Sequence, residues 1–386
     1  EITDEQYKEF YHHVGQGFDD PWHTLHYRAE GAIEYTALLF IPTAKPFDLF
    51  SPERKGHVKL YVNRVFISDG LEGLMPQYLR FVRGVVDSTD LPLNVSREML
   101  QNNPVLRKIQ SGIVKRLFKD LKDRAEKPDE YAAFWDVFGA VFKEGLYEDF
   151  ERRDDLLELV RFKSTAGDGL VSLKEYVSRM KEGQDAVYYI TGENAAMLKN
   201  SPQLEGFVAK GIEVLLLTDP IDEFWIPSVG VYEKMQLKSV GEAGADLSKI
   251  TGDEKQDKPE DAAPEDTLKS LIENLKKTLG DAVTDVRASD RLTGSPVCLV
   301  AETGGMSLHL ARMLKQHGES GGAIPKVLEI NPRHGLIKRM AELPEESLSD
   351  AAHLLLDQAR IVEGEPVPDP VAFARRLSIM VEKGLA

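Results

Sequence analysis

One arginine and one glutamine stand where the chain could bind a phosphate. Arg97 and Gln101 follow Pro92, which disfavours helix in the residue before it, and an asparagine and a serine, which favour turns and helix caps. The segment therefore predicts a loop that delivers both side chains close to the start of a helix. A guanidinium is planar, permanently charged and suited to a phosphate. On the residues alone, an ordinary ion pair of Arg97 with Glu98 or another neighbour stays open.

The sequence has no motif that could hold a nucleotide by itself. Neither the P-loop pattern nor Gly-x-Gly-x-x-Gly after a strand occurs. Ser320 lies in a run that matches the esterase elbow, but the run follows a predicted helix where that motif needs a strand, so a stand-alone hydrolase is a remote alternative. His23 and His26, near two aspartates, could be drawn as metal ligands, yet no cluster completes a site, and we expect no metal. The sequence thus predicts that Arg97 forms one half of a phosphate-binding site whose other half lies elsewhere.

Length and composition limit the class of protein. A chain of 386 residues suggests two or three domains, and 42% hydrophobic residues can build their cores. Cys298 is the only cysteine, which excludes an internal disulfide and fits a reducing compartment. No apolar run is long enough to span a membrane, and the first residues are not a signal peptide. Because the chain starts at Glu1 rather than methionine, we expect a piece of a longer protein.

The net charge of -16 opposes binding to nucleic acid. One basic run follows the central loop, and we interpret it as a solvated helix face. We expect neither nucleic acid nor a membrane among the partners. The basic residues of the run are Arg107, Lys108, Lys115, Arg116, Lys119 and Lys122.

Periodicity in the first half predicts an α/β fold. Residues 33–41 and 57–67 are rich in β-branched and aromatic residues and predict strands. A stripe of apolar residues at helical spacing follows, which predicts one long amphipathic helix. The stripe consists of Leu106, Ile109, Ile113, Leu117 and Leu121.

Further along, the runs 186–191 and 212–217 predict parallel strands joined through helix. The first 228 residues thus predict a large α/β unit (1–128), a helical connector (129–182) interrupted by Gly145 and by a loop at 164–169, and a smaller αβα unit (183–228).

The second half begins with a change in composition. Residues 241–266 are dominated by Asp, Glu, Lys, Gly, Ala and Pro, and predict an acidic mobile segment. Helices at 268–279 and 306–316 alternate with strands at 283–287, 297–300 and 326–330. We assign residues 229–386 to a second domain of the α+β class.

Two helices near the end of the chain carry apolar stripes. A helix over 348–362 and another over 373–381 cannot bury both faces alone. One interpretation is that the stripes dock onto their own domain; the other is a helical bundle completed by a second copy. The stripe residues are Leu348, Ala352, Leu355, Ala359, Val362, Phe373, Leu377, Met380 and Val381.

Several runs resemble the ninety-kilodalton heat-shock chaperones, in particular their bacterial members. The run LPLNVSRE (91–98), preceded by FVRGVVDS (81–88), is similar to the catalytic loop of the family's middle domain. Further runs match in the same order over essentially the whole chain. They are EITDEQYKEFY (1–11), LFIPTAKPFDLF (39–50), KLYVNRVFI (59–67), YVSRMKEG (176–183), YYITG (188–192) and VLLLTDPIDE (214–223).

The resemblance implies a role for the central loop. In the family, the arginine matching Arg97 reaches the terminal phosphate of ATP held by a separate amino-terminal domain, and the glutamine matching Gln101 helps to build the closed site. That domain, with its carboxylate base and magnesium ligand, has no counterpart here. We expect ATP and magnesium as cofactors of the full-length protein, none for this chain, and little or no ATP hydrolysis by this chain alone.

The resemblance also implies surfaces for partners. Residues 229–386 match the family's dimerisation domain, so we expect a homodimer through the two terminal helices. The stripe Met306, Leu310, Met313 and Leu314, which could equally be core, matches a helix that exposes an apolar face to client proteins. Glu223, Phe224 and Phe18 match further client-contacting positions.

We therefore expect an ATP-dependent chaperone of the stress response, which binds and remodels partly unfolded client proteins as a homodimeric clamp, with other chaperones as further partners. The chain lacks the acidic Glu-Glu-Val-Asp tail of eukaryotic cytosolic members, which favours the bacterial cytoplasm. The alternative is an ATP-independent client-holding or structural scaffold, in which Arg97 plays no catalytic part.

Overall fold

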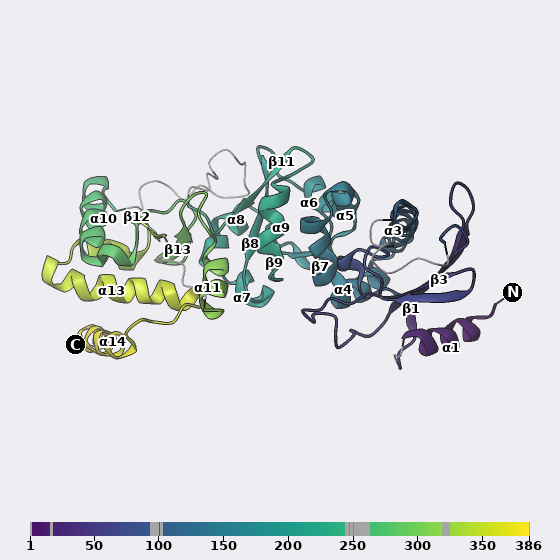
Figure 1. Cartoon of the computed structure of the whole chain (residues 1–386). Helices are drawn as coiled ribbons and strands as arrows, with labels where there is room; N and C mark the ends of the chain where they lie inside the picture. The colour runs from purple at the N-terminus through teal and green to yellow at the C-terminus, as the bar shows by residue number, and fades with distance from the viewer. Residues whose placement is uncertain are drawn as a thin grey trace. The chain divides into compact units, whose positions relative to one another are not determined.

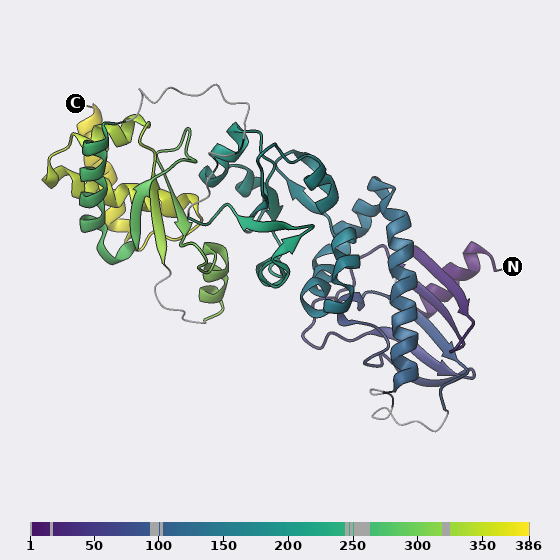
Figure 2. The same cartoon turned by 90° about the horizontal axis from the view of Figure 1, so that it is seen from above.

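Helices and sheets are mixed along the chain, which confirms the predicted α/β fold class. The chain divides into two compact units between Arg161 and Phe162. Figures 1 and 2 show the elements that form each unit. The computed structural model describes residues 2–15, 18–92, 100, 103–243, 247, 250, 263–318 and 325–385.

The first unit is built on a five-stranded sheet of order β1-β2-β5-β3-β4. Only β3 and β5 run parallel; the other pairs are antiparallel. Helices α1 and α3 lie on opposite faces of the sheet (Figure 1). The elements are α1 (Asp4–Gly15), β1 (Pro21–Ala29), β2 (Tyr35–Pro42), β3 (His57–Val62), β4 (Val65–Asp69), η1 (Gln77–Leu79), β5 (Arg83–Ser88), α3 (Pro104–Ala125), α4 (Pro128–Glu148), η2 (Phe150–Arg152) and α5 (Arg153–Leu159).

The long helix α3 confirms the helix predicted after the central loop. It begins where the Asn103 side chain accepts a hydrogen bond from the Val105 amide at 2.8 Å, and proline occupies its first turn, where an amide hydrogen has no helical partner. All five residues of the predicted apolar stripe are buried. The stripe therefore packs into the core of the unit, and the start of the helix is fixed locally.

The strand predicted over 57–67 is instead a hairpin. β3 and β4 pair antiparallel, and the two residues between them, Asn63 and Arg64, have φ angles of 49° and 65°. Left-handed conformations at both positions match the twist of the flanking strands, which is the geometry of a tight two-residue turn. The run has no glycine at the turn, so its composition resembles one continuous strand.

Gly145, expected to interrupt the helix, lies inside α4 and is buried. A Cβ there would meet the ring of Tyr78 at 2.9 Å and Leu156 at 3.0 Å. The glycine therefore permits close packing of α4 against its neighbours and does not end the helix.

The second unit opens with a six-stranded sheet of order β10-β11-β8-β9-β6-β7. β8 pairs parallel with β9, which confirms the predicted βαβ crossover. The elements are β6 (Phe162–Ser164), β7 (Gly167–Val171), α6 (Leu173–Ser178), β8 (Ala186–Thr191), α7 (Ala195–Lys199), η3 (Pro202–Leu204), α8 (Glu205–Ala209), β9 (Leu215–Leu217), α9 (Asp222–Val229), β10 (Val231–Tyr232) and β11 (Met235–Ser239).

A three-stranded sheet of order β12-β14-β13 follows in the same unit. Helices α10, α12 and α13 contribute to its core with Leu275, Ile337 and Ala352, among others. The elements are α10 (Glu265–Leu279), η5 (Gly280–Ala282), β12 (Asp285–Ala288), β13 (Val297–Ala301), α11 (Leu308–Gln316), β14 (Lys326–Ile330), α12 (Gly335–Ala341), α13 (Glu345–Val362) and α14 (Pro370–Leu385).

A buried arginine joins the two sheets of the second unit. Arg291 donates to the carbonyls of Val240 and Glu242, which follow β11, and its Nε lies 3.0 Å from the carboxylate of Glu329 in β14. The side chains of both Arg291 and Glu329 are only 3% exposed. Because a buried charge is tolerated only when it is paired and hydrogen-bonded, these contacts tie the two sheets together.

The domain boundaries predicted from the sequence stay predictions. β10 and β11 follow residue 228 and complete the first sheet of the second unit. The hairpin of β6 and β7 lies within the segment 129–182 that we expected to be helical. Most of the segment 241–266 lies outside the described residues.

We predict that Gly84→Ala destabilises the chain by about 2–4 kcal/mol. Gly84 has a φ of 136°, and an added Cβ would lie 2.2 Å from the backbone oxygen of Leu38 in the neighbouring strand. Urea unfolding followed by circular dichroism measures the change. Gly56→Ala is the control, because its Cβ would meet nothing closer than 3.8 Å. Equal midpoints for the two variants would contradict the prediction.

Candidate functional site

The predicted phosphate-binding residues Arg97 and Gln101 lie outside the described residues. Two buried leucines lie close to them in the sequence. Leu91, before both residues, is 2% exposed, and Leu100, between Arg97 and Gln101, is 1% exposed. Near Leu91, the carboxylate of Asp90 accepts a hydrogen bond from the Glu34 amide at 2.6 Å. Leu91 and Leu100 are thus packed into the first unit.

The histidines considered as metal ligands have other partners. His23 Nε2 lies 3.1 Å from the Asp120 carboxylate, and Arg124 Nε donates to His23 Nδ1 at 3.1 Å. Burial, followed by the charge of Arg124, lowers the pKa of His23. In the part of the chain that the structure describes, no three His, Cys, Asp or Glu side chains gather as metal ligands.

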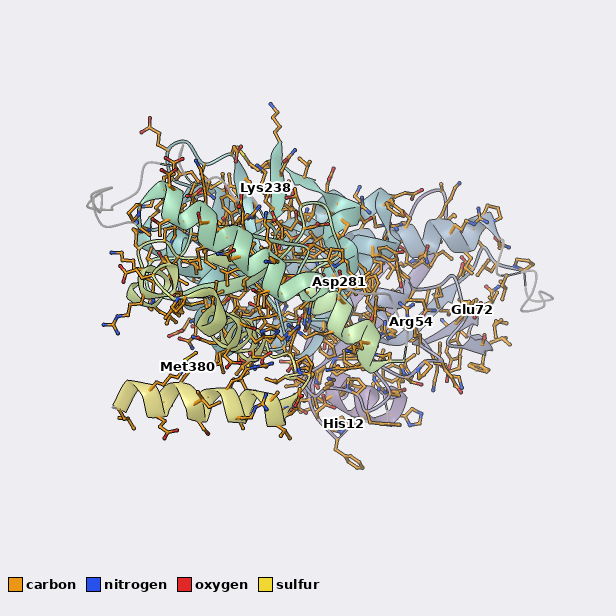
Figure 3. All side chains as sticks on the ribbon, turned by 90° about the vertical axis from the view of Figure 1, so that its left-hand side faces the viewer. His12, Arg54, Glu72, Lys238, Asp281 and Met380 are labelled. Carbon is orange, nitrogen blue, oxygen red and sulfur yellow. The ribbon has the colours of Figure 1, made fainter. Side chains whose placement is uncertain are left out.

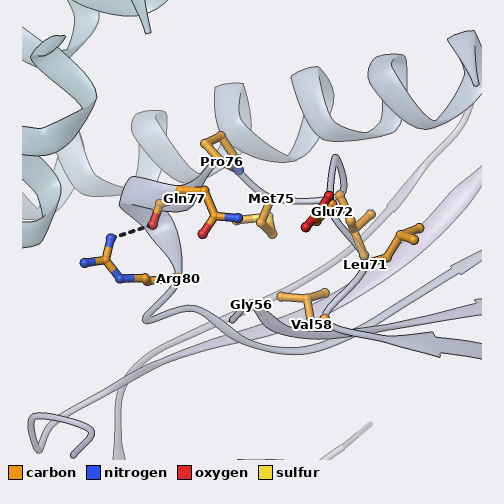
Figure 4. A pocket seen from close by; sticks show the side chains of 10 residues that line it. Gly56, Val58, Leu71, Glu72, Met75, Pro76, Gln77 and Arg80 are labelled. Carbon is orange, nitrogen blue, oxygen red and sulfur yellow. Dashed lines mark hydrogen bonds between the residues drawn. The ribbon is translucent and has the colours of Figure 1, made fainter. Parts of the chain in front are cut away.

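A small pocket in the first unit has among its lining residues an arginine that is already paired (Figure 4). Arg80 donates to the backbone oxygens of Gln77 and Leu49 and forms a two-pronged contact with Glu144, at 2.6 and 2.8 Å. Its guanidinium is thus occupied by hydrogen bonds within the unit and is not available to a ligand. Val58, Leu71 and Met75 are among the other residues that line the pocket.

Two segments predicted to contact client proteins meet in the second unit. The Ser307 hydroxyl, just before α11, donates to the Glu223 carboxylate in α9 at 2.8 Å. Next in sequence to the bonded residues, Phe224 is 44% exposed and Met306 is 47% exposed. The hydrogen bond therefore joins the two segments that carry these apolar residues, although 84 residues separate its two members.

Helix α11 has two apolar faces. Leu308 and Ala311 are buried, and Leu308 joins the core of the second sheet. The predicted stripe lies elsewhere on the helix: Leu310, Met313 and Leu314 are each only partly buried. We call Phe224, Met306, Leu310, Met313 and Leu314 the α9–α11 surface. It remains open to a partner of apolar character.

Glu223 and Phe18 differ from each other in exposure. Glu223 is only 9% exposed, and burial raises the pKa of its carboxyl group, although the hydroxyls of Thr191 and Ser307 oppose that effect. Its carboxylate therefore faces the interior of the chain. Phe18 belongs to the first unit and is fully exposed.

The two terminal helices differ in how their stripes are covered. Leu348, Ala352, Leu355 and Ala359 of α13 are buried in the core of their own chain. That burial matches the alternative in which the stripe docks onto its own domain.

No residue of α14, the helix with Met380 labelled in Figure 3, is fully buried in the single chain. Val362, Leu377, Val381 and Leu385 are 45–85% exposed. Phe373 and Met380 are half-buried. Leu377, Val381 and Leu385 line an open apolar hollow. An unpartnered apolar face therefore lies on α14 rather than on α13.

A polar junction joins α13 to its surroundings at Glu363. The amide of Gln203, in η3, donates to the Glu363 carboxylate and to the Leu299 carbonyl, both at 2.8 Å. Arg312 of α11 donates to the Glu363 backbone oxygen. The connector from here to α14 contains Gly364, with a φ of 74°, and two prolines, and a third proline begins α14.

Burial raises the pKa of the Glu363 carboxyl group to about 7. The nearby charge of Arg312 opposes this shift, and that of Glu365 adds to it. The residues of this junction carry no sequence signal, since they act only through distant contacts. Ser307 could have been recognised, because serine is a preferred residue just before a helix.

The comparisons with known proteins agree with the resemblance. The family described as Hsp90 protein matches residues 1–386, and the chain belongs to that family. It is similar to the chaperone protein HtpG of Paramagnetospirillum magneticum, with 62% identity, and to those of Rhodospirillum rubrum and Roseobacter denitrificans, with 59% and 53%. The matches cover 100% of this chain and 63% of each relative, so the chain spans less than two thirds of their length.

In the described part of the chain, no helix is long and apolar enough to cross a membrane.

We predict that Glu363→Gln makes stability less dependent on pH. A carboxyl group with a raised pKa binds its proton more tightly in the folded state, so its contribution is present at low pH and is lost as the pH rises through about 7. Relative to the unchanged chain, the variant should gain about 1–3 kcal/mol between pH 5 and pH 8. Urea unfolding across this range measures it.

Exposed Glu342→Gln is the control, with no such trend expected. Any hydrogen bond that the glutamine disturbs shifts the Glu363→Gln curve equally at every pH. A difference between variant and unchanged chain that is constant from pH 5 to pH 8 would refute the assignment.

Proposed function

We propose that this chain is the middle and carboxyl-terminal part of an ATP-dependent molecular chaperone. The observation that carries the proposal is the match to the Hsp90 family over all 386 residues, with relatives named chaperone. The exposed apolar residues Phe224 and Met306, and those on α14, support it, since such residues are suited to a protein partner. In this proposal the chain works in the bacterial cytoplasm, in the response to stress, alongside other chaperones.

The central loop supplies the catalytic contribution of this chain. Arg97 would bind the terminal phosphate of ATP, which a further domain holds together with magnesium, and Gln101 would support the closed site. A fixed guanidinium stabilises the charge that develops on the phosphoryl group during transfer. The burial of Leu91 and Leu100 supports this role, because both residues, close to Arg97 and Gln101 in the sequence, are packed into the first unit.

The α9–α11 surface, with Phe18 of the first unit, would contact partly unfolded proteins. Methionine side chains are flexible and polarisable, so Met306 and Met313 can adapt to different apolar partners. An unfolded polypeptide exposes such apolar groups, whereas a folded protein buries most of them. The surface is therefore suited to bind polypeptides because they are unfolded, rather than because they carry a particular sequence.

The apolar face of α14 would join two copies of the chain. Four of the five stripe residues of α13 are already buried in its own chain, so Leu377, Val381 and Leu385 on α14 are the main residues that association would bury. A two-fold pairing brings the same face of each copy together. The resulting dimer is the base of the proposed clamp.

We predict that Arg97→Ala lowers ATP turnover about 10–100-fold in the complete protein, with the ATP-binding domain present. Binding of an unfolded polypeptide by the present chain should not change. Arg28→Ala is the control, since Arg28 is an exposed arginine that forms surface ion pairs with Glu30 and Glu34. Unchanged turnover in Arg97→Ala would favour the alternative, a client-holding scaffold without a catalytic arginine.

We predict that Leu377→Asp with Val381→Asp converts a dimer to a monomer. Two carboxylates in the apolar face would have to be buried on association, which is strongly unfavourable. Light scattering should then give the 43.2 kDa of one chain. Arg375→Asp, two residues from Leu377 and so on the opposite side of α14, should remain dimeric. If all three chains have the same mass, α14 is not the interface.

A further inference from the structure

Three groups form a hydrogen-bonded chain at the start of α11. The Leu310 amide donates to the Ser307 hydroxyl oxygen at 2.9 Å, and that hydroxyl donates to the Glu223 carboxylate at 2.8 Å. A hydroxyl that accepts one bond and donates another polarises both. The cap of α11 is therefore completed by a side chain from a different helix.

The position of Glu223 relative to two helices adds a charge effect. Glu223 lies in the first turn of α9, and through Ser307 it also faces the start of α11. The amino-terminal end of a helix carries partial positive charge, which a carboxylate stabilises. One carboxylate thus serves the beginnings of both helices.

A second contact holds α11 further along its length. Arg312 donates to the backbone oxygen of Glu363, the residue that follows α13. With Ser307 fixed at one end and Arg312 fixed one turn later, α11 cannot rotate about its own axis without losing one of these bonds. Its partly exposed stripe therefore faces a constant direction.

The exposure of neighbouring residues separates two roles. Phe224 and Met306 are nearly half exposed and can be touched by another polypeptide, whereas Glu223 is nine-tenths buried. The Glu223 carboxylate therefore offers a client almost no surface to contact. Glu223 therefore contacts the start of α11, whereas Phe224 and Met306 are accessible to the partner.

We propose that Glu223 is a positioning residue, which fixes the start of α11 through the Ser307 hydroxyl and so aligns the α9–α11 surface for an unfolded polypeptide. This inference rests on the proposed client-binding function. It assigns Glu223 no direct contact with the client.

Hydrogen exchange in the chain without any client tests the positioning step. Glu223→Ala and Ser307→Ala should each speed exchange of the amides at the start of α11 about five-fold, as expected for a lost helix cap, and the double variant should be no faster. Ser307→Thr, which keeps the hydroxyl, should exchange like the unchanged chain. Glu302→Ala is the matched control, an exposed carboxylate five residues before Ser307. Unaltered exchange in Glu223→Ala would overturn the proposal.

Binding of reduced, carboxymethylated α-lactalbumin, a polypeptide that cannot refold, tests the consequence. Glu223→Ala, Ser307→Ala and their double variant should weaken binding by the same factor, about five-fold, because all three lose one cap. Phe224→Ala should weaken binding further in each background. If the Glu223 and Ser307 effects multiply instead, Glu223 contacts the client directly and the proposal is wrong.

The two hypotheses fail in different ways. If the unchanged chain does not bind the unfolded probe, the proposed function is refuted, and with it the consequence for clients. Hydrogen exchange still shows in that case whether Glu223 fixes the start of α11.

Discussion

The second unit depends on one buried cation. Arg291 is almost completely removed from solvent, and its guanidinium meets carbonyls that follow one sheet and a carboxylate within the other. Glu329 is held in turn by Arg287, at 2.6 Å, and by the Ser289 hydroxyl, at 2.9 Å. Removing Glu329 would leave the Arg291 guanidinium buried without its carboxylate partner, which is far more costly than losing a surface ion pair. These polar contacts therefore help to fix the two sheets to each other.

Helix α11 lies at the edge of this fixed arrangement and joins its parts. Ser307, just before the helix, is bound to α9, and Arg312, within the helix, is bound to the residue after α13. A force on the α9–α11 surface is therefore shared between two segments that are distant in sequence. Through Arg312 and Glu363, the surface proposed for clients is connected within one unit to the start of the connector that leads to α14.

Patterns with a strong period were predictable from the sequence. The stripe of α3, the parallel pair β8 and β9, and the helices of the carboxyl-terminal part all follow from the spacing of apolar residues. The turn at Asn63 and Arg64 was missed because neither residue is the glycine that usually marks such a turn. Gly145 was misjudged because a glycine inside a helix looks like a break until its close neighbours are known.

The candidate site was less predictable, since it depends on contacts between distant residues. The sequence placed Phe224 and Met306 among residues that face a partner, and both are exposed. It could not show that Glu223 turns inward, because a carboxylate in the first turn of a helix is usually solvated. It also could not decide what covers an apolar stripe: the stripe of α13 meets its own core, while that of α14 does not. Arg97 and Gln101 lie outside the described residues, so their roles rest on the sequence.

The connector between α13 and α14 has a consequence for association. Pro366 and Pro368, with Pro370 at the start of α14, each fix one backbone angle, and the Glu365 carboxylate just before them is held by Lys326 at 2.6 Å. A chain restricted in this way has few conformations to lose when α14 meets a partner. The entropy of ordering the connector is already lost when the single chain folds, so more of the apolar burial on α14 remains as binding free energy. The prolines thus act as a stiff spacer that keeps α14 at a nearly constant distance from the end of α13.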